Sequence, residues 1–369
     1  MATLVRHLIA AALLGITLLA SGAAAASGDS GPLPAGDALH TPALVNLGFE
    51  CAEGYSPRPG ITGIVPNGWT AVVLDGQPEL HSARVKFTGS CSSTGFAERI
   101  EGQDSMVMLA EDIETPPLPG KPFDAVVYQQ TAVTPGVTYS LSAWMVSLCG
   151  GSAIPNDCPP GYYMAKMLGI DPTGGTNPLA PSVVWVEDRR NFTESRWANL
   201  YSAATAQSST LTLFGRIRSP FRWHGAHAFV DAFSLVQAPT AQFANLPSSV
   251  LGSQVTVRWQ GSLGPDIPAI PGGTHQLLFD VQHRSAGQAT WQDWQAGAPA
   301  GQATLSVDGC LGTQTIELRL RVRAEQPPGG PGAWPNHRYP GVWSQPASVT
   351  FVSPAVCTPG AYLPLVSVR

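Results

Sequence analysis

The chain has 369 residues, a net charge of −5 at neutral pH, and charged side chains at only 12% of its positions. This mild negative charge excludes the basic face that nucleic-acid binding requires, so no nucleic acid is expected as a partner. The chain is 44% hydrophobic, enough for a core, and its 39 glycines and 34 prolines favour short strands joined by turns over long helices.

The N-terminus has the three parts of a secretory signal peptide. Arg6 and His7 precede an apolar run from Leu8 to Ala20, and small residues follow up to Ala26. The run is shorter than the ~20 residues that a membrane-crossing helix needs. We therefore expect residues 1–26 to be removed, rather than kept as a membrane anchor. The mature chain is then secreted or held at the cell surface, without a transmembrane segment.

A first series of strands is predicted after a linker at 27–40 that is rich in Gly, Pro, Asp and Ser. Residues 41–237 contain alternating or β-branched runs bounded by turn residues, and no sustained helical period. The predicted strands are 43–49, 105–109, 125–131, 138–146, 164–170, 210–218 and 226–235. Seven or more antiparallel strands favour an all-β sandwich of the jelly-roll type.

A second, more compact series occupies 238–353. Its predicted strands are 254–260, 275–283, 290–295, 303–307, 314–324 and 344–352. Their spacing favours an immunoglobulin-like β-sandwich, with Trp259 in the core because it alternates with Val255 and Val257. The tail at 354–369 is either one more strand or packed segment, or a signal for retention at the surface.

The six cysteines favour disulfides, because an exported chain enters an oxidising compartment. No C-x-x-C pair is present, so a zinc site is not expected. Six cysteines allow 15 pairings, and spacing alone does not decide among them. The hypothesis adopted pairs Cys149 with Cys158, Cys310 with Cys357, and the remaining Cys51 with Cys91.

Five short motifs of the first segment occur in an order that is typical of one family. They are Asn46–Glu50 (NLGFE), Gly68–Trp69, Val127–Gln130 (VYQQ), Thr134–Trp144 (TPGVTYSLSAW) and Phe229–Leu235 (FVDAFSL). With them, residues 41–237 resemble the carbohydrate-binding modules of the galactose-binding-like jelly-roll class, especially the CenC type. The chain departs from that pattern in its long loops and in Cys51, which directly follows Glu50.

Residues 238–353 resemble a fibronectin type III domain. The resemblance depends on Trp259, on Arg321–Ala324 at a strand end, and on Gly341–Ser344 near the last strand. The usual tyrosine of the penultimate strand is replaced by Leu318 or Leu320. The resemblance implies a spacer or an interaction module.

Asp231 is a candidate metal ligand. Period-2 alternation puts it on one strand face with Phe229 and Phe233, and an unpaired buried carboxylate is very unfavourable. The family resemblance implies a structural Ca²⁺ ion between the first and last strands, held by Glu50, Asp231 and backbone oxygens near 46–48. The alternative is that Asp231 pairs with an arginine or with backbone N–H groups.

Aromatic residues are the candidate sugar-binding groups, because their rings cover the apolar faces of sugars while polar neighbours bind the hydroxyls. Alternation puts Trp144 on the more polar face of its strand, whereas Trp69 is assigned to the core. Gln129 and Arg216 are expected on the same concave surface as Trp144. Tyr162, Trp185 and Trp223 are expected at its rim. For each aromatic residue, packing in the core or in a loop is the alternative.

No catalytic motif occurs in the chain, so it is not expected to be an enzyme. The interpretation is a secreted protein that binds an extracellular polysaccharide or other glycan, with the second domain as a spacer. One alternative is a structural or adhesive surface protein that binds another protein. The other is a glycoside hydrolase, with its paired carboxylates drawn from the acidic run Glu111, Asp112 and Glu114.

Overall fold

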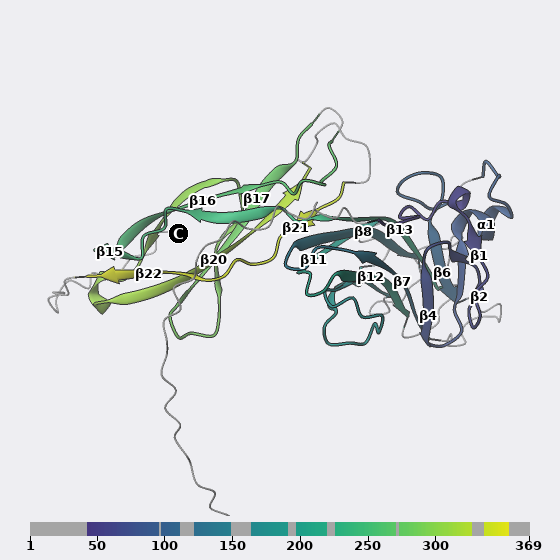
Figure 1. Cartoon of the computed structure of the whole chain (residues 1–369), viewed down its shortest axis with the longest axis horizontal. Coiled ribbons are helices and arrows are strands. Elements are labelled where there is room, and N and C mark those ends of the chain that lie inside the picture. The colour runs from purple at the N-terminus through teal and green to yellow at the C-terminus, as the bar shows by residue number, and fades with distance from the viewer. Residues whose placement is uncertain are drawn as a thin grey trace, which may run out of the picture. The chain divides into compact units, whose positions relative to one another are not determined.

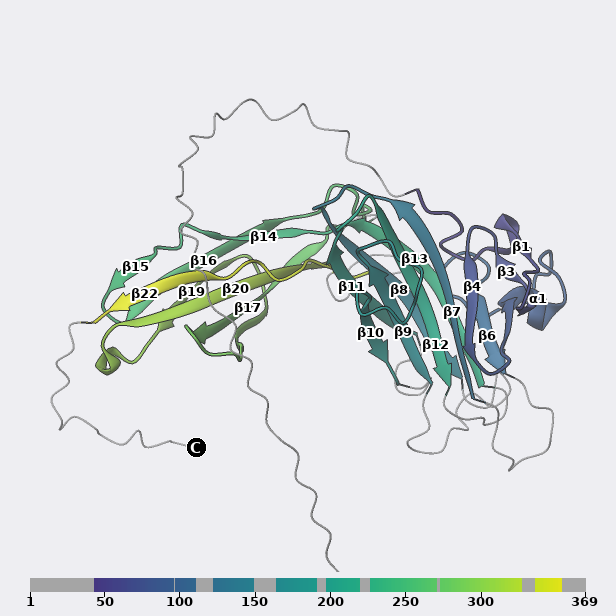
Figure 2. The same ribbon diagram turned by 60° about the horizontal axis from the view of Figure 1, so that its bottom comes forward.

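The structure, a computed structural model, describes residues 43–95, 97–110, 122–148, 164–190, 197–219, 226–270, 273–326 and 336–353. Nearly all regular elements in these ranges are β-strands, and they form two β-sandwiches with separate hydrophobic cores (Figures 1 and 2). The all-β fold class is therefore confirmed. No helix within the described ranges is long and apolar enough to cross a membrane.

The first sandwich consists mainly of a five-stranded and a six-stranded sheet. The five-stranded sheet has the order β10-β9-β12-β7-β4, formed by β4 (Thr70–Asp75), β7 (Phe123–Ala132), β9 (Ala165–Asp171), β10 (Val184–Asp188) and β12 (Thr210–Ser219). The six-stranded sheet has the order β11-β8-β13-β6-β5-β2, formed by β2 (Thr62–Gly63), β5 (Glu79–Ser82), β6 (Met106–Ala110), β8 (Thr138–Leu148), β11 (Ala198–Thr205) and β13 (Ala226–Gln237). From β7 to β13 the chain passes repeatedly from one sheet to the other, as in a jelly roll.

Short elements complete this sandwich. They are the 3₁₀-helix η1 (Cys51–Glu53), the paired strands β1 (Tyr55–Ser56) and β3 (Val65–Pro66), and the helix α1 (Ala83–Thr88). Ser82 caps the N-terminus of helix α1, because its side chain accepts a hydrogen bond from the backbone N–H of Val85. Gly89 caps the C-terminus, and its φ of 77° suits a residue without a Cβ.

The core between the two sheets is built from alternate residues of each strand. On β8 these are Tyr139, Leu141, Ala143 and Met145, and on β12 they include Leu211, Leu213 and Ile217. Trp69 is also in this core, 2% exposed and in contact with the rings of Phe49 and Phe233. The core position predicted for Trp69 is confirmed.

The strand predicted at 43–49 is wrong. These residues form no regular element, and Asn46 and Phe49 have left-handed φ angles of 50° and 51°. An extended strand needs negative φ angles, so the segment turns instead and places Phe49 in the core, where it is 0% exposed.

The alternation predicted along β13 is also wrong beyond Asp231. Ala228 and Val230 face the main core and Phe229 faces outward, but Phe233 and Leu235 again face the main core. The register shifts between Asp231 and Ser234, and Ala232 between them has a φ of 51°. A β-bulge therefore moves the later side chains to the other face.

The second sandwich has three strands facing a larger sheet. The three-stranded sheet has the order β14-β16-β19, formed by β14 (Thr240–Ala244), β16 (Gln254–Ser262) and β19 (Gly301–Ser306). The larger sheet has the order β15-β22-β20-β17-β18, with β21 added beside β20, and its strands are β15 (Ser249–Leu251), β17 (Gln276–Ser285), β18 (Gln292–Ala298), β20 (Gln314–Glu325), β21 (Tyr339–Pro340) and β22 (Ala347–Val352). The 3₁₀-helix η2 (Gly309–Leu311) precedes β20. Trp259 is in the core of this sandwich, 4% exposed, as its alternation predicts.

Candidate functional site

Three aromatic side chains form a row across the outer face of the five-stranded sheet. The register places Phe214 of β12 beside Tyr128 of β7 and Gly169 of β9, while Trp185 of β10 lies opposite Gly169. The ring centroid of Phe214 is 5.7 Å from that of Tyr128 and 5.7 Å from that of Trp185. Figure 2 shows these strands side by side. We call Tyr128, Phe214 and Trp185 the aromatic row.

The members of the aromatic row are exposed to different degrees. Phe214 is 0% exposed, whereas Tyr128 and Trp185 are half-buried. Phe214 packs with Val126 and Val183 beneath the other two rings. Tyr128 and Trp185 are therefore the members of the row that a ligand can contact.

Gly169 allows the indole of Trp185 to lie close to the sheet. A Cβ atom added at position 169 meets three atoms of the Trp185 ring at 2.7, 2.7 and 2.9 Å, closer than real Cβ contacts. Any other residue here forces the ring outward. The pair thus fixes the height of the indole above the β-strands.

Arg216 and Asp124 form a nearly buried ion pair next to the row. Arg216 Nε donates to Asp124 Oδ1 at 2.8 Å, and Arg216 Nη2 donates to Asp124 Oδ2 at 2.6 Å. The guanidinium carbon of Arg216 lies 5.8 Å from the ring centroid of Trp185. The hydrogen bonds to Asp124 outweigh burial and raise the pKa of Arg216, with smaller contributions from the charges of Asp124 and Glu187. The planar group is held in one orientation while some of its N–H donors remain available.

A hollow of about 460 Å³ adjoins this ion pair. Its lining includes both members of the pair together with Asp75, Pro122, Phe123, Arg218 and Ser219. Its volume is within the range of small-ligand sites. Arg218 and Asp75 are exposed, so the hollow combines charged donors and acceptors with the adjacent half-buried rings.

The loop between β9 and β10 borders the same face. Asp171 fixes its first turn by accepting hydrogen bonds from Thr173 N and Thr173 Oγ1, and its second oxygen accepts one from Ser182 Oγ. Gln130 Nε2 donates to Gly174 O at 2.8 Å. These contacts attach the loop to the sheet at both of its ends.

Two of the predicted ligand-binding residues, Trp185 and Arg216, lie together at this face. Gln129 does not share it, because its side chain points to the opposite side of β7, is 5% exposed, and exchanges two hydrogen bonds with the backbone of Val45. Trp144 lies in the other sheet and is 6% exposed, so it offers no open platform. Tyr162 and Trp223 lie outside the described residues.

Sequence reasoning missed Asp124, Tyr128 and Gly169 as parts of this face. The alternation of β7 contains the signal for two of them, because Ala125 and Val127 face the core and their neighbours must face outward. The pairing of Asp124 with Arg216 follows from strand register, which no local pattern in the sequence specifies.

Asp231, a predicted metal ligand, is 0% exposed and accepts three backbone hydrogen bonds. Its Oδ2 accepts from Ile100 N at 2.7 Å and from Glu101 N at 3.2 Å, and its Oδ1 accepts from Ala232 N at 2.7 Å. The structure therefore shows the alternative in which backbone N–H groups pair with the Asp231 carboxylate. These bonds lower the pKa of Asp231, but burial outweighs them and raises it well above the ordinary value.

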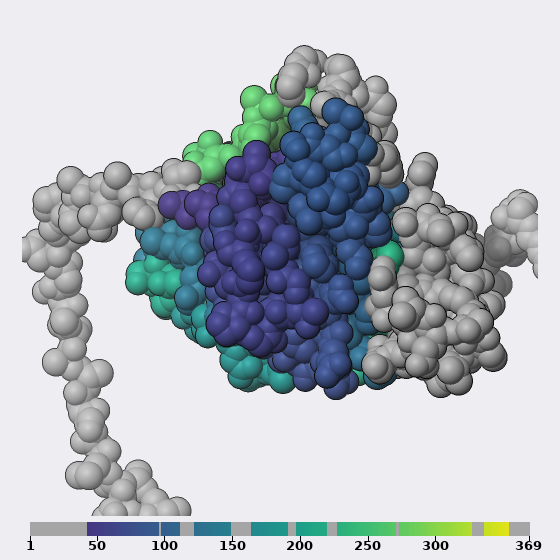
Figure 3. Space-filling view, turned by 90° about the vertical axis from the view of Figure 1, so that its right-hand side faces the viewer, coloured from purple at the N-terminus to yellow at the C-terminus, as the bar shows by residue number. Residues whose placement is uncertain are grey.

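Glu50, the other predicted metal ligand, precedes η1 rather than ending a strand. Both of its oxygens accept from Gln103 N, at 3.0 and 3.1 Å. Burial raises the pKa of Glu50, of Glu101 and of Asp104 as well. We call Glu50, Glu101, Asp104 and Asp231 the acidic cluster. Three of its members belong to the segment 43–110, which covers the face of the sandwich seen in Figure 3.

The chemistry of the acidic cluster suits a hard cation in part. Asn46 Oδ1 nearby in the chain is buried without a hydrogen-bond partner, and oxygen donors of this kind bind Ca²⁺. Against this, the backbone oxygens of Asn46 and Leu47 already accept hydrogen bonds. No three His, Cys, Asp or Glu side chains of the described ranges converge closely enough to hold a metal ion.

The disulfide predicted between Cys51 and Cys91 is confirmed, with 5.5 Å between the Cα atoms. It joins η1 to the segment after α1. Cys310 is also disulfide-bonded. Cys149, Cys158 and Cys357 lie outside the described residues, so the other two pairings stay predictions.

No protein-family model matches the chain, and no curated protein matches it. Among solved structures, it is similar to TmCBM61 in complex with β-1,4-galactotriose, with a TM-score of 0.32 and 15% identity over 54% of this chain and 99% of that chain. It is also similar to the adhesin domain of Epf from Streptococcus pyogenes, with a TM-score of 0.26 and 8% identity over 85% of this chain and 98% of that chain. Scores this low assign no function to the chain.

Proposed function

We propose that the first sandwich binds a neutral glycan at the outer face of its five-stranded sheet. The observation that carries the proposal is the placement of Trp185, held low over Gly169, beside the Arg216–Asp124 pair and its hollow. A half-buried indole covers the apolar face of a sugar ring, and a fixed guanidinium and carboxylate bind its hydroxyls. Tyr128 extends the aromatic contact along the row.

The proposed activity is binding without catalysis. Both oxygens of Asp124 accept hydrogen bonds from Arg216, which supports a positioning role rather than general acid or base chemistry. Secretion or display at the cell surface is part of the proposal. The Cys51–Cys91 disulfide supports it, because such bonds persist in oxidising compartments.

A structural Ca²⁺ ion at the acidic cluster is also part of the proposal. Glu50 and Asp231 would hold it together with oxygen atoms of the segment 46–48 such as Asn46 Oδ1, and it would neutralise two carboxylates whose pKa burial raises. The ion would stabilise the loops around 46–50 and 98–104 and take no part in sugar binding.

A glycan array tests the function directly. The purified chain from residue 27 onward is expected to bind at least one neutral plant, bacterial or chitin-like polymer. Trp185→Ala is expected to weaken that binding by about tenfold or more, because truncating a central aromatic residue of a binding site to alanine typically costs about 2 kcal/mol or more.

Phe87→Ala is the matched control. Phe87 is 36% exposed and belongs to α1. Its ring contacts Phe229 on the outer side of the six-stranded sheet, away from the aromatic row. It is expected to leave glycan binding unchanged. Absence of binding across the array, or equal loss in both variants, would overturn the glycan proposal and favour a protein-binding surface instead.

A further inference from the structure

The second sandwich carries an alternating stack of arginine and tryptophan side chains. The guanidinium carbons of Arg284 and Arg319 each lie 4.4 Å from the ring centroid of Trp291. Those of Arg319 and Arg321 each lie 4.6 Å from the ring centroid of Trp343. We call these five residues the arginine–tryptophan stack, and Arg319 is its centre.

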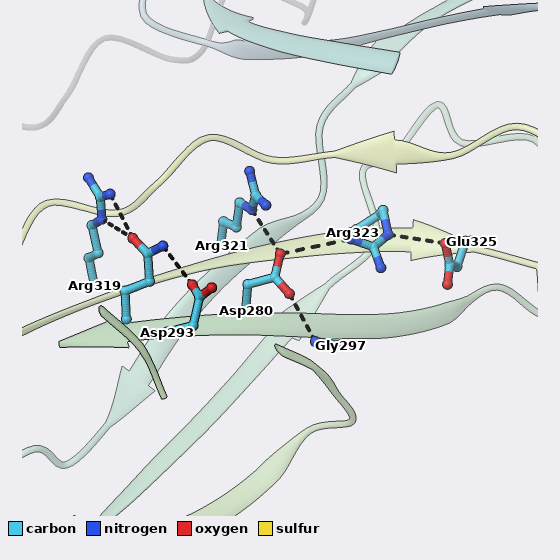
Figure 4. A network of polar contacts seen from close by, with 8 residues as sticks. Asp280, Asp293, Gly297, Arg319, Arg321, Arg323 and Glu325 are labelled. Carbon is cyan, nitrogen blue, oxygen red and sulfur yellow. Dashed lines mark hydrogen bonds and ion pairs between the residues drawn. The ribbon is translucent and has the colours of Figure 1, made fainter. Parts of the chain in front are cut away.

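Each outer arginine of the stack has a carboxylate partner. Arg284 pairs with Glu317 at 2.6 Å, and Arg321 pairs with Asp280 at 2.9 Å. Figure 4 shows the same network continuing through Arg323, which contacts Asp280 at 3.8 Å and Glu325 at 3.0 Å. These pairs offset part of the positive charge on either side of the centre.

Arg319 differs from its neighbours. Its Nε and Nη2 atoms both donate to the same amide oxygen, Gln282 Oε1, at 2.9 and 2.7 Å, and Gln282 in turn donates to Asp293 at 2.8 Å (Figure 4). No carboxylate of the described residues forms an ion pair with Arg319. The centre of the stack is thus a charged group, fixed by two rings and an amide, that has no counter-ion among the residues the structure describes.

The environment of Arg319 favours an anion. Burial lowers its pKa, and the charges of Arg284 and Arg321 lower it further. An anion beside Arg319 would relieve the repulsion among the three guanidinium groups. Because the tryptophan rings hold those groups in place, little side-chain entropy is lost when an anion binds.

A polar hollow of about 350 Å³ lies beside one end of the stack. Arg284 is part of its lining, with His283, Ser285, Gln288, Thr290 and Gln292, while Leu305 and Ile316 supply apolar surface. Side chains that both donate and accept hydrogen bonds suit a ligand with many hydroxyl groups.

We propose that the arginine–tryptophan stack binds the carboxylate groups of an acidic polysaccharide, with Arg319 as the central contact. This site goes beyond the proposed function, since it lies in the other sandwich and recognises charge. A polysaccharide fits better than an acidic peptide, because protein partners bury an apolar centre, whereas both rings of the stack are packed against guanidinium groups and the hollow is lined by more polar than apolar residues.

Trigalacturonate is the probe, titrated by calorimetry into the full chain from residue 27 onward at low salt. Arg319→Gln removes the charge and is expected to weaken binding by about tenfold or more, the usual effect of losing a charge-assisted hydrogen bond. Arg319→Lys keeps the charge but loses the planar group, and an intermediate loss is expected. The fully methyl-esterified trimer is expected to bind about tenfold more weakly to the unmodified chain.

Arg258→Gln is the matched control, because Arg258 is an exposed arginine on β16 of the facing sheet. It is expected to change the affinity by less than about twofold. Melting curves show whether the Arg319 variants fold, and the ester comparison decides the question on the unmodified chain if they do not.

Three outcomes overturn this proposal. They are equal affinity of the unmodified chain for trigalacturonate and its methyl ester, equal affinity of the Arg319 and Arg258 variants for trigalacturonate, and an affinity for triglutamate at least as high as that for trigalacturonate. The last result would assign the stack to an acidic peptide. Trp185→Ala is expected to leave trigalacturonate binding unchanged, so failure here is separate from failure of the neutral-glycan site.

Discussion

Asp124 binds Arg216 through both carboxylate oxygens, and Arg216 in turn lies beside the indole of Trp185. The two charged residues come from β7 and β12, 92 positions apart in sequence. Each side chain of the pair is only 11% exposed. The pair therefore does two things: it stabilises the contact between two central strands, and it orients a donor group at the edge of the hollow.

Removing one partner of this pair is expected to be costly. Asp124→Ala leaves a nearly buried guanidinium without its carboxylate, so we expect the free energy of unfolding to fall by about 3 kcal/mol. The double variant Asp124→Ala/Arg216→Ala is expected to be less destabilised than the sum of the two single variants. Urea unfolding of the three variants measures this, and simple additivity would show that the pair contributes no coupling.

Gly169→Ala is expected to separate binding from folding. The added Cβ must displace the ring of Trp185, which contacts it at 2.7 Å. Trp185 is half-buried and has room to move outward, so we expect a stability loss of only about 1 kcal/mol. Glycan binding is expected to fall by about tenfold, because the ring no longer lies at its native height.

The readout for Gly169→Ala combines tryptophan fluorescence with affinity. Gly215→Ala is the comparison, since its added Cβ approaches Phe233 of the core at 3.0 Å rather than the outer face. That variant is expected to lose stability more than affinity. Unchanged glycan affinity in Gly169→Ala would contradict a role for the indole position.

Alternation of apolar residues predicted much of the fold. It identified β12, whose core face includes Leu211 and Leu213, and it placed Arg216 on the other face. It also identified β20, where Leu318 and Leu320 are buried between partly exposed polar residues. Burial on one side of a sheet imposes a period of two, and the sequence records this directly.

The candidate site was less predictable, because neighbours across strands depend on register. Trp144 has the alternation of an outward residue, yet the outer face of its sheet carries a second apolar cluster that includes Val146 and Leu148. The bulge at Ala232 reverses the faces of β13, and alanine gives no sign of a left-handed φ. The sequence indicates Trp185 and Arg216 as candidate ligand-binding residues, but it contains no signal for the contact between them.

The Cys51–Cys91 disulfide is expected to stabilise the first sandwich. It closes a loop with a sequence separation of 40. The loop-entropy relation gives about 4 kcal/mol for a loop of that length. Cys51→Ser/Cys91→Ser is therefore expected to unfold at a much lower urea concentration, whereas chemical reduction would also break the disulfide of Cys310. An unchanged midpoint would show that the segment after α1 is not tied to the fold through this bond.

Calcium is expected to raise the melting temperature of the chain, and a chelator to lower it. A ligand that binds only the folded state at about 100 times its dissociation constant adds roughly 3 kcal/mol of stability. Glu50→Gln is expected to abolish the response, because it removes a carboxylate of the acidic cluster. Glu53→Gln, an exposed neighbour in η1, is the control and should keep the response. A melting temperature that no added calcium or chelator moves would remove the ion from the proposal.

The acidic cluster also predicts a pH dependence in the presence of chelator. Burial raises the pKa of Asp231, Glu50 and Glu101 in the folded state above the ordinary values of 3.8 for Asp and 4.5 for Glu. The folded chain therefore binds more protons than the unfolded chain between those values and the raised ones. Stability from these groups is present at lower pH and is lost as the pH rises through the raised pKa values.

Without calcium, we expect these three groups to contribute more to the stability of the chain at about pH 5 than at about pH 7. Calcium is expected to stabilise the chain more at the higher pH, where the carboxylates are ionised. Glu101→Gln should reduce the difference, because it removes one of the buried charges and its repulsion with Glu50. Urea unfolding at the two pH values, with and without calcium, measures the free energy of unfolding under all four conditions. A calcium effect that is larger at the lower pH would contradict the assignment, since protons and the cation would then not compete for the same carboxylates.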